Sequence, residues 1–210
     1  MFGQRATTLD RGLDAFERKE WKRARRLLEE ALESEDRAVG NYHLGLLYWR
    51  GLGGERDVRA GADRFARAAD DGHSAAQTAY GMALRSGVGV AKDSEAARGL
   101  FRLAAGAGDH EAMVQIATMS EPDEARHWLQ RASEVGHPSA MLHLADMMMA
   151  RDPIEALSWL YAAVTLSADE GARKRANALA REMTAKEIEQ AQKIGRTYVK
   201  EIKDRGRQRR

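Results

Sequence analysis

Apolar and small residues recur along most of this chain at the three- and four-residue spacing of amphipathic helices. Ala38, Leu44 and Tyr48 share one helical face, and Phe65 and Ala69 share another in the segment that follows. Short breaks rich in glycine or polar residues separate these stripes. The pattern predicts an all-α protein of about 12 helices, arranged as consecutive antiparallel pairs.

The helical pattern repeats with a period of about 36 residues. Leu44-Gly45 recurs as Tyr80-Gly81, and Phe65 recurs as Phe101 at the same offset. The other matches at this offset are Gly51 with Gly87, Gly53 with Gly89, Asp57 with Asp93, Ala68-Ala69 with Ala104-Ala105, and Gly72 with Gly108. Such a period indicates an array of two-helix units, in which each unit buries its apolar face against its neighbours.

The repeated small and polar residues have physical roles in such a unit. Gly45 lets the second helix of the pair approach closely, and Gly51 and Gly53 permit a left-handed turn after the first helix. Asp57 is placed to cap the second helix, and Gly72 to end it. We therefore expect the same geometry at the equivalent positions of the next copy.

The later copies are less regular. The third lacks eight residues, because Ser120-Glu121-Pro122-Asp123 replaces the glycine loop with a helix-starting turn. The predicted organisation is a single array over residues 1–202, followed by a basic tail over 203–210 that is expected to be disordered. Its parts are an N-terminal pair at 8–37, repeats at 38–74, 75–110, 111–138 (shortened) and 139–168, and capping helices at 169–202.

The motif A-x5-L-G-x2-Y-x2-G-x-G, followed by D and then W/F-x2-A-A-x2-G, resembles the Sel-one-like repeat (SLR) family of the tetratricopeptide-like superfamily. Its residues are Ala38, Leu44-Gly45, Tyr48, Gly51, Gly53, Asp57, Phe65, Ala68-Ala69 and Gly72. The second copy departs at Tyr80 and Leu84, and the last two copies lack the loop glycines but keep Trp128-Leu129 and Trp159-Leu160. The resemblance covers about Leu9 to Tyr198. It implies a right-handed α-solenoid and a scaffold or adaptor role, often in bacterial regulation.

Catalytic and cofactor-binding motifs are not recognisable in the sequence. Cysteine is absent, the glycine loops lack the order of a phosphate-binding loop, and no G-x-S-x-G motif occurs. We therefore expect no enzyme activity, no cofactor and no metal. No long apolar run or secretory signal is seen, which favours a cytoplasmic protein.

Three histidines, His73, His110 and His137, follow the glycines that end each repeat. A ladder of metal ligands or of acid–base groups is one interpretation. The other is that each histidine caps the following helix, and their matching place in the repeat favours it.

The first helix of each pair lines the concave face in tetratricopeptide-like arrays, and the positions aligned with that face are unusually apolar here. A groove for a peptide or helical segment of another protein is the resulting hypothesis. Its predicted lining is Leu13, Phe16, Tyr42, Leu46, Trp49, Arg50, Met82, Arg85, Val114, Thr118, Glu121, Leu142, Asp146 and Met149. The alternative is that residues such as Tyr42, Leu46 or Met149 pack between repeats. Trp49-Arg50 is the predicted hot spot.

Charge is distributed unevenly along the chain. Residues 173–210 hold 13 Lys and Arg against 5 Asp and Glu, a net charge of +8, whereas the rest carries −6 and the whole +2. The basic C-terminal end provides a second hypothesis, contact with nucleic acid or an anionic membrane. A solubilising end is favoured over that contact, because no aromatic residue for base stacking follows Tyr198.

Overall fold

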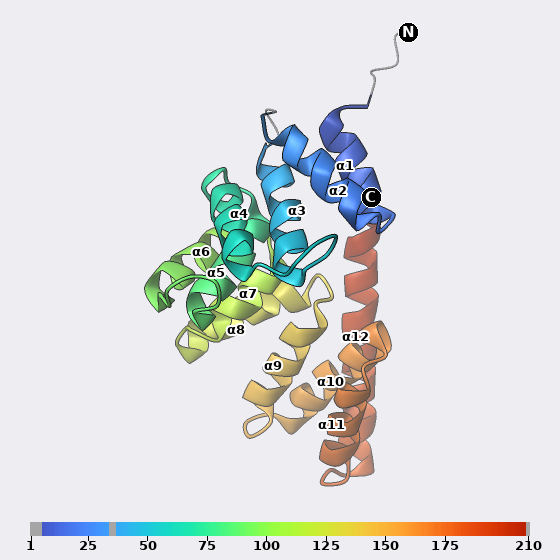
Figure 1. The fold of residues 1–210 in the computed structure, drawn as a ribbon. Helices are drawn as coiled ribbons and strands as arrows, with labels where there is room; N and C mark the ends of the chain where they lie inside the picture. Colours follow the sequence, from blue (N-terminus) through green and yellow to red (C-terminus); the bar gives the residue numbers. More distant parts are fainter. Residues whose placement is uncertain (1–5, 34–36, 209–210) are drawn as a thin grey trace. The chain divides into compact units, whose positions relative to one another are not determined.

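The computed structural model describes residues 6–33 and 37–208, and it contains helices and no strand over these ranges. The helices of residues 1–112 are α1 (Thr8–Glu17), α2 (Trp21–Glu30), the 3-10 helix η1 (Ala31–Glu33), α3 (Arg37–Arg50), α4 (Val58–Asp70), α5 (Ser74–Ser86) and α6 (Ser94–Gly106). They are followed by α7 (His110–Ala117), α8 (Pro122–Ser133), α9 (Pro138–Met148), α10 (Pro153–Ser167), α11 (Glu170–Ala180) and α12 (Ala185–Gln208). The predicted all-α class with 12 α-helices is confirmed over the described residues (Figure 1).

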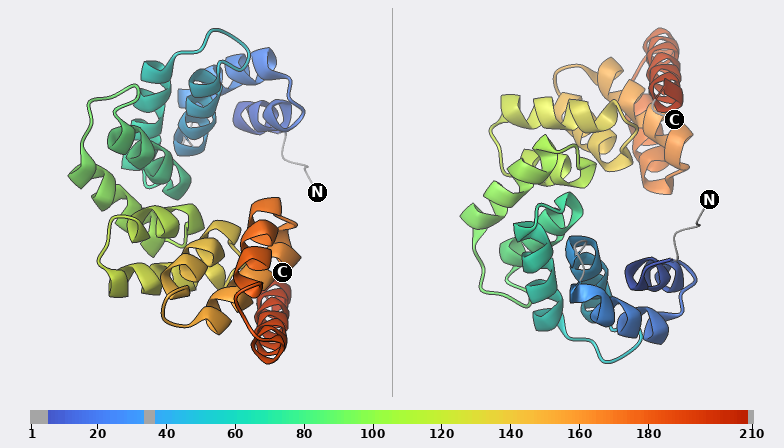
Figure 2. Two further views of the ribbon diagram at one scale, coloured as in Figure 1. Left: turned by 90° about the horizontal axis from the view of Figure 1, so that it is seen from below. Right: turned by 90° about the horizontal axis from the view of Figure 1, so that it is seen from above.

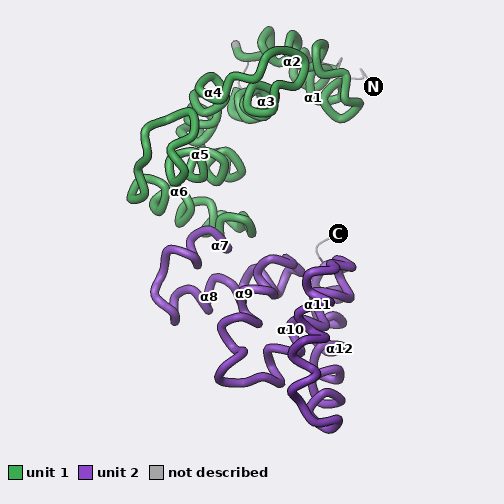
Figure 3. Tube along the Cα trace, turned by 60° about the horizontal axis from the view of Figure 1, so that its bottom comes forward, with its two compact units in different colours: residues 1–112 green, residues 113–210 purple. Residues whose placement is uncertain are grey.

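The chain forms two compact units, residues 1–112 and 113–210 (Figure 3). Within each unit, consecutive helices pack as pairs, most extensively α3 with α4 and α5 with α6 in the first unit and α9 with α10 in the second (Figure 2). The boundary falls inside α7, at the shortened third copy. The eight-residue helix α7 is the shortest α-helix among the described residues. It therefore offers less surface for packing than its counterparts in the other copies.

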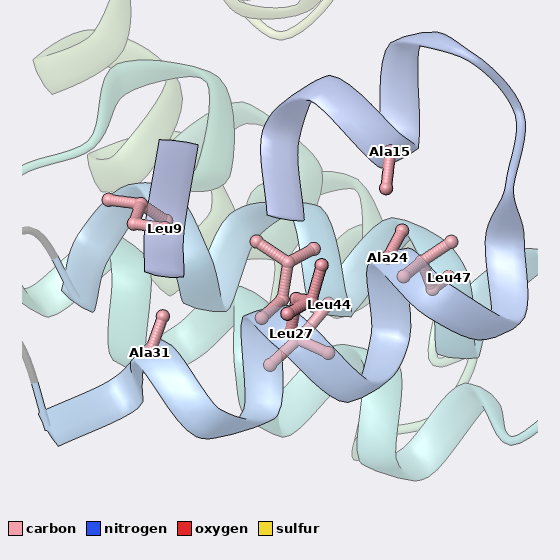
Figure 4. Packing of buried hydrophobic residues seen from close by; sticks show 8 residues of the cluster. Leu9, Ala15, Ala24, Leu27, Ala31, Leu44 and Leu47 are labelled. Atoms are coloured by element: carbon pink, nitrogen blue, oxygen red, sulfur yellow. The ribbon is translucent and has the colours of Figure 1, made fainter. Parts of the chain in front are cut away.

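The core of the N-terminal unit begins in its first helix pair. Leu27 and Leu28 of α2 are buried against Leu44 and Leu47 of α3, together with alanines of α1 and α2 (Figure 4). Alanine at these positions brings the helix backbones close together, and leucine fills the space between them. The N-terminal pair therefore packs on the first repeat as a helix pair of the same kind.

Glycine at the repeat's close-approach position makes room for an aromatic ring. A methyl carbon placed on Gly45 would lie 2.5 Å from Cδ1 and Cε1 of Phe65, and one on Gly81 would lie 2.7 Å from Cε1 of Phe101. Both phenylalanines are buried. The predicted close approach is thus present in two successive repeats, and its partner is the phenylalanine of the same unit's second helix.

The loop glycines adopt the left-handed backbone conformation that the sequence predicts, and they also pack between repeats. Gly53 has a φ of 76° and Gly89 a φ of 73°. A methyl carbon on Gly89 would lie 2.3 Å from the carbonyl oxygen of Val58, at the start of α4. One on Gly53 would lie 2.6 Å from the carbonyl carbon of Trp21, at the start of α2. Each loop therefore packs on the first turn of the second helix in the preceding helix pair. The turn pattern alone does not predict this contact.

The predicted helix caps are confirmed at both complete repeats. The Asp57 carboxylate accepts hydrogen bonds from the backbone N–H groups of Arg59 and Ala60 at 3.0 and 2.9 Å. Asp93 accepts the equivalent bonds at the start of α6, at 3.1 and 2.9 Å. The expected histidine cap is present at His73, whose Nδ1 accepts from the N–H of Ala76 at 3.2 Å.

Two other histidines differ from that expectation. His110 is the first residue of α7 rather than its cap, and the carboxylate of Asp109 accepts the N–H of Ala112 at 2.8 Å instead. His137 occupies the cap position of α9 without a side-chain capping bond. A carboxylate one residue earlier, at Asp109, is the stronger acceptor for the helix N-terminus.

In the C-terminal unit, α10 is the central helix and packs on α9, α11 and α12. Trp159, at the repeat's aromatic position, is buried, and its ring stacks on Tyr198 at a centroid distance of 4.0 Å. Trp128, the equivalent residue of the third copy, is only partly buried, and its indole N–H donates to Glu124 at 3.4 Å. The turn at Ser120 and Glu121 leads directly into Pro122, the first residue of α8, as the sequence predicts.

The predicted disorder from Lys203 onward is wrong for the described residues, because α12 continues to Gln208. Two side chains on the packed face of the helix explain its length. Ile202 lies against Gly136, and the guanidinium of Arg205 pairs with Glu134 at 2.8 Å. Arg209 and Arg210 lie outside the described residues.

Candidate protein-binding surface

The predicted groove residues of the N-terminal unit come mainly from one face of α3. Tyr42, Leu46 and Trp49 follow one another at four- and three-residue spacing, so they share a helical face. The rings of Tyr42 and Trp49 both contact the ring of Phe65, at centroid distances of 6.1 and 5.8 Å. All three α3 side chains are partly buried. The same phenylalanine that occupies the space above Gly45 therefore positions the two exposed-edge aromatic rings.

A continuous row of rings crosses this unit. Phe16 of α1 contacts His43 of α3 edge to face at 4.9 Å, and His43 contacts Tyr42 at 5.3 Å. Tyr42 in turn stacks on His73 at 4.6 Å, with an interplanar angle of 23°. We call the surface formed by Phe16, Tyr42, His43, Trp49 and His73 the aromatic surface. Each of the five rings is partly exposed.

Sequence reasoning missed both histidines of the aromatic surface as members of the predicted binding face. His43 follows Tyr42 directly, but its Nδ1–H donates to the carbonyl of Val39 at 2.9 Å, which turns its ring toward α1. His73 was expected as a helix cap, or as one of a ladder of metal or acid–base groups, and not as part of a protein-binding face. Its capping bond is what holds the imidazole flat against Tyr42. No spacing rule indicates such contacts between different helices.

The predicted binding face also includes charged residues. Arg50 is exposed at the end of α3, and Arg85 of α5 holds its guanidinium 5.8 Å from the centroid of the Phe101 ring. Burial raises the pKa of Tyr42, Asp109 raises it further, and Arg50 opposes them. Burial lowers the pKa of His73, and His43 adds to that effect. Asp109 is therefore close enough to act on Tyr42 and His73, a neighbour that the sequence pattern did not indicate.

The lowered pKa of His73 predicts a pH dependence of stability. The folded state takes up a proton at this site less readily than the unfolded chain, whose histidine titrates near pH 6.5. The contribution of the neutral His73 ring to the stability of the folded state is fully present above about pH 6.5 and is lost as the pH falls below that value. Urea unfolding followed by circular dichroism should show lower stability at pH 5.5 than at pH 7.5. His73→Asn, which keeps a capping side chain, should reduce this difference, and an unchanged difference would contradict the assignment.

The remaining predicted lining residues of this unit differ in exposure. Leu13 is partly buried against the first core cluster, as Phe16 is. Tyr42 is partly buried against alanines of α4 and α5, so the alternative of packing between repeats also holds for this side chain. Met82 of α5, equivalent to Leu46 of α3, is 38% exposed. Several of the predicted side chains therefore pack partly against the core and remain partly exposed to solvent.

The C-terminal unit holds the other predicted lining residues, and they do not form an equivalent surface. Val114 is only 4% exposed, so it does not line a binding face, because its small apolar side chain fills the core. Thr118 and Glu121 follow the end of α7 instead of lying within it. Leu142 is partly buried, and Asp146 pairs with Arg175 of α11 at 3.2 Å. Met149 lines a cavity of about 460 Å³ with Leu179 and Met183.

Two other features, a metal-binding group and a membrane-spanning helix, are not found among the described residues. Over 6–33 and 37–208, no group of three or more metal-ligating side chains is close enough to hold an ion. None of the helices in these ranges combines the length and apolar character needed to span a membrane.

Comparison with known proteins agrees with the repeat pattern. The family model for the Sel1 repeat matches residues 38–73, 74–109, 120–137 and 138–167, which is more than half of the chain. The whole of α7 and the two residues that follow it, 118 and 119, fall outside the matched copies, at the point where the third repeat is shortened. No curated protein matches the sequence.

Two solved structures show the same fold. A Sel1 repeat protein from Oxalobacter formigenes superposes with a TM-score of 0.75 at 20% sequence identity, covering 92% of this chain and 83% of that one. A protective antigen of uropathogenic Escherichia coli strains with an SLR fold gives a TM-score of 0.59 at 18% identity, covering 93% of this chain and 53% of the antigen. At these identities the likeness concerns the fold.

Proposed function

Because this chain belongs to the Sel1 repeat family, whose members are generally protein–protein interaction scaffolds, we propose that it holds a segment of a partner protein on the aromatic surface and the adjoining face of α5. The proposed role is binding without catalysis, as is typical of this fold.

The row of partly exposed rings is the observation that supports this proposal. Aromatic side chains supply large contact areas at low entropic cost, and they dominate the binding energy of many interfaces. The contacts with Phe65 and between neighbouring rings hold Tyr42 and Trp49 in place before a partner arrives. Such preorganisation reduces the entropy lost on binding.

The charges around the rings suggest the chemistry of the segment. Arg50 and Arg85 are the basic residues of the predicted face, and both belong to the first helix of a repeat. An apolar segment flanked by acidic residues would be complementary to them. Met82, exposed and flexible, would adapt to an apolar side chain of that segment.

Replacing Met82 by glutamate is expected to weaken partner binding at least tenfold, because it puts a carboxylate into an apolar contact. The matched control is Leu103→Glu, which makes the same kind of change on α6, the second helix of the repeat, at a side chain 62% exposed. Partner proteins captured from the native host by a photo-crosslinking residue at position 82 or 103 would be identified by mass spectrometry. Their binding to both variants would then be measured by calorimetry.

The two variants distinguish the faces of the repeat. Loss of binding with Met82→Glu and not with Leu103→Glu supports the proposal, provided that both variants unfold at the wild-type temperature. Loss only with Leu103→Glu would assign binding to the second helices and refute it. Arg50→Glu is a second test at an exposed residue, and it should weaken binding and reduce its salt dependence.

A further inference from the structure

Helix α12 has two opposite faces of different chemistry. Ile188, Ala191, Tyr198 and Ile202 lie on the side that packs on the protein, where Gly195 approaches the backbone of α10 closely. The helix begins at a reciprocal cap, in which the N–H of Thr184 donates to Glu187 at 2.8 Å and the N–H of Glu187 donates to the Thr184 hydroxyl at 3.4 Å. The packed face and the capped start hold α12 in one orientation about its axis.

The outward face of α12 is basic along its whole length. At 100° per residue, six side chains fall within an arc of about 100°, opposite to the packed face. They are Lys186, Lys193, Arg196, Lys200, Lys203 and Arg207, and all are exposed. We call these six residues the basic stripe. It extends for about 30 Å at a rise of about 1.5 Å per residue.

Few carboxylates neutralise the basic stripe. Glu189 lies within the same arc and Asp204 at its edge, where Asp204 pairs with Arg207 at 3.8 Å. Across the part of the chain that the structure describes, the other five basic side chains form no ion pair. Arg205, which is not part of the basic stripe, pairs with Glu134 on the packed side of α12 and so contributes to the packing of the helix. The basic stripe is therefore not needed for the fold and is available to a partner.

We propose that the basic stripe binds the phosphate backbone of double-stranded DNA. Lys and Arg at regular three- and four-residue spacing on a straight helix match a partner whose negative charges also recur in a regular line. Lys and Arg side chains directed at phosphates do not read the bases, so this binding is independent of base sequence. This proposal does not depend on the proposed binding of a partner protein at the aromatic surface of the N-terminal unit.

Three observations favour a DNA duplex over other polyanions. The apolar face of α12 is packed on the protein, so the helix has no apolar side to insert into a membrane. The stripe has no aromatic ring on which single-stranded bases could stack. The major groove of B-form DNA is wide enough to admit a basic helix between its two lines of phosphates, whereas the major groove of duplex RNA is deep and narrow.

The test measures binding of the full-length protein to a fluorescent duplex DNA of about 20 base pairs, by anisotropy between 50 and 200 mM salt. With six basic and two acidic side chains on the arc, log K should fall against log salt with a slope of about −4. The variant Lys193→Gln, Arg196→Gln, Lys200→Gln removes three basic groups of the stripe. It should reduce the slope by about 3 and the affinity at 100 mM salt more than about 100-fold.

A control with the same change in net charge separates the stripe from general basicity. Arg151→Gln, Lys174→Gln, Arg181→Gln alters three exposed residues outside α12 and should leave the slope and affinity nearly unchanged. Glu189→Gln removes the acid within the arc and should raise the affinity severalfold. All three variants change exposed side chains, and their unfolding temperatures would show whether the fold is kept.

The same proteins are tested on an RNA duplex and on phosphatidylserine vesicles. Tighter binding to either of these than to DNA would overturn the proposal, and so would an absence of DNA binding at 50 mM salt. Equal losses in the stripe variant and the control would also overturn it, because net charge alone would then explain the affinity. A duplex-DNA preference that the stripe variant alone removes is the supporting result.

Discussion

Replacing Phe101 by alanine is expected to lower the free energy of unfolding of the N-terminal unit by about 3–5 kcal/mol. The side chain is 0% exposed. It fills the space between α6 and α5 over Gly81, which has no side chain of its own to occupy that space. The cost therefore includes both the lost burial of the ring and the cavity left behind.

The same site offers a double-variant test of the close approach. In the wild-type background, Gly81→Ala puts a methyl carbon 2.7 Å from the Phe101 ring, and overpacking should cost about 1–3 kcal/mol. When Phe101 is already alanine, the methyl group has space. Gly81→Ala should then stabilise by up to about 1 kcal/mol, because alanine favours the helix over glycine. The sign of its effect should therefore reverse.

Urea unfolding followed by circular dichroism measures these differences. The control is Gly99→Ala on α6, where a methyl group would have no neighbour within 4 Å, so that only helix propensity acts. This variant should be stabilised by about 1 kcal/mol in either background. If Gly81→Ala had the same effect with and without Phe101, the ring could not be the reason for glycine at that position.

Gly89→Ala is expected to destabilise the protein by about 2–4 kcal/mol, through two effects that a second variant separates. Its φ of 73° strains any residue with a Cβ atom, which costs about 1–2 kcal/mol. In addition, the new methyl group would lie 2.3 Å from the carbonyl oxygen of Val58. Since that oxygen belongs to the backbone, α4 and the loop would have to move apart.

Gly87→Ala is the matched variant, because Gly87 has nearly the same φ, 72°, in the same loop. Its methyl group would lie 3.3 Å from Cβ of Lys92, and the nearest backbone atom, the Lys92 nitrogen, would be at an ordinary contact distance of 3.7 Å. We therefore expect Gly87→Ala to cost about 1–2 kcal/mol and Gly89→Ala clearly more. Equal losses in urea unfolding would mean that the loop's contact with α4 contributes nothing to stability.

The aromatic surface was only partly predictable from the sequence. Tyr42 and Trp49 could be assigned to one face because helical spacing determines which residues of a single helix lie together. His43 and His73 belong to the aromatic surface because their rings contact rings of other helices, and residue spacing within one helix does not indicate such contacts. Val114 shows the opposite error. Alignment with the other repeats predicted that it lines the binding face, but within the short helix α7 its side chain is buried.

The C-terminal helix shows a similar division. Its apolar stripe and capping box were readable from the sequence, and both are present. Its length was not, because the last turns depend on the Arg205–Glu134 pair and on Ile202 packing at Gly136, which come from a different repeat. Lys203, Arg205 and Arg207, which were assigned to a disordered end, thus belong to an ordered helix.

The 36-residue period, the helix pairs, the capping aspartates and the left-handed glycines were all determined by the sequence itself. Each is a local property: side-chain spacing along one helix, or the backbone freedom of one residue. The tertiary structure alone decided which ring lies over which glycine, which loop rests on which helix, and which predicted surface residues are buried. Those outcomes depend on contacts between residues far apart in the chain, and a pattern of spacings within one segment does not contain them.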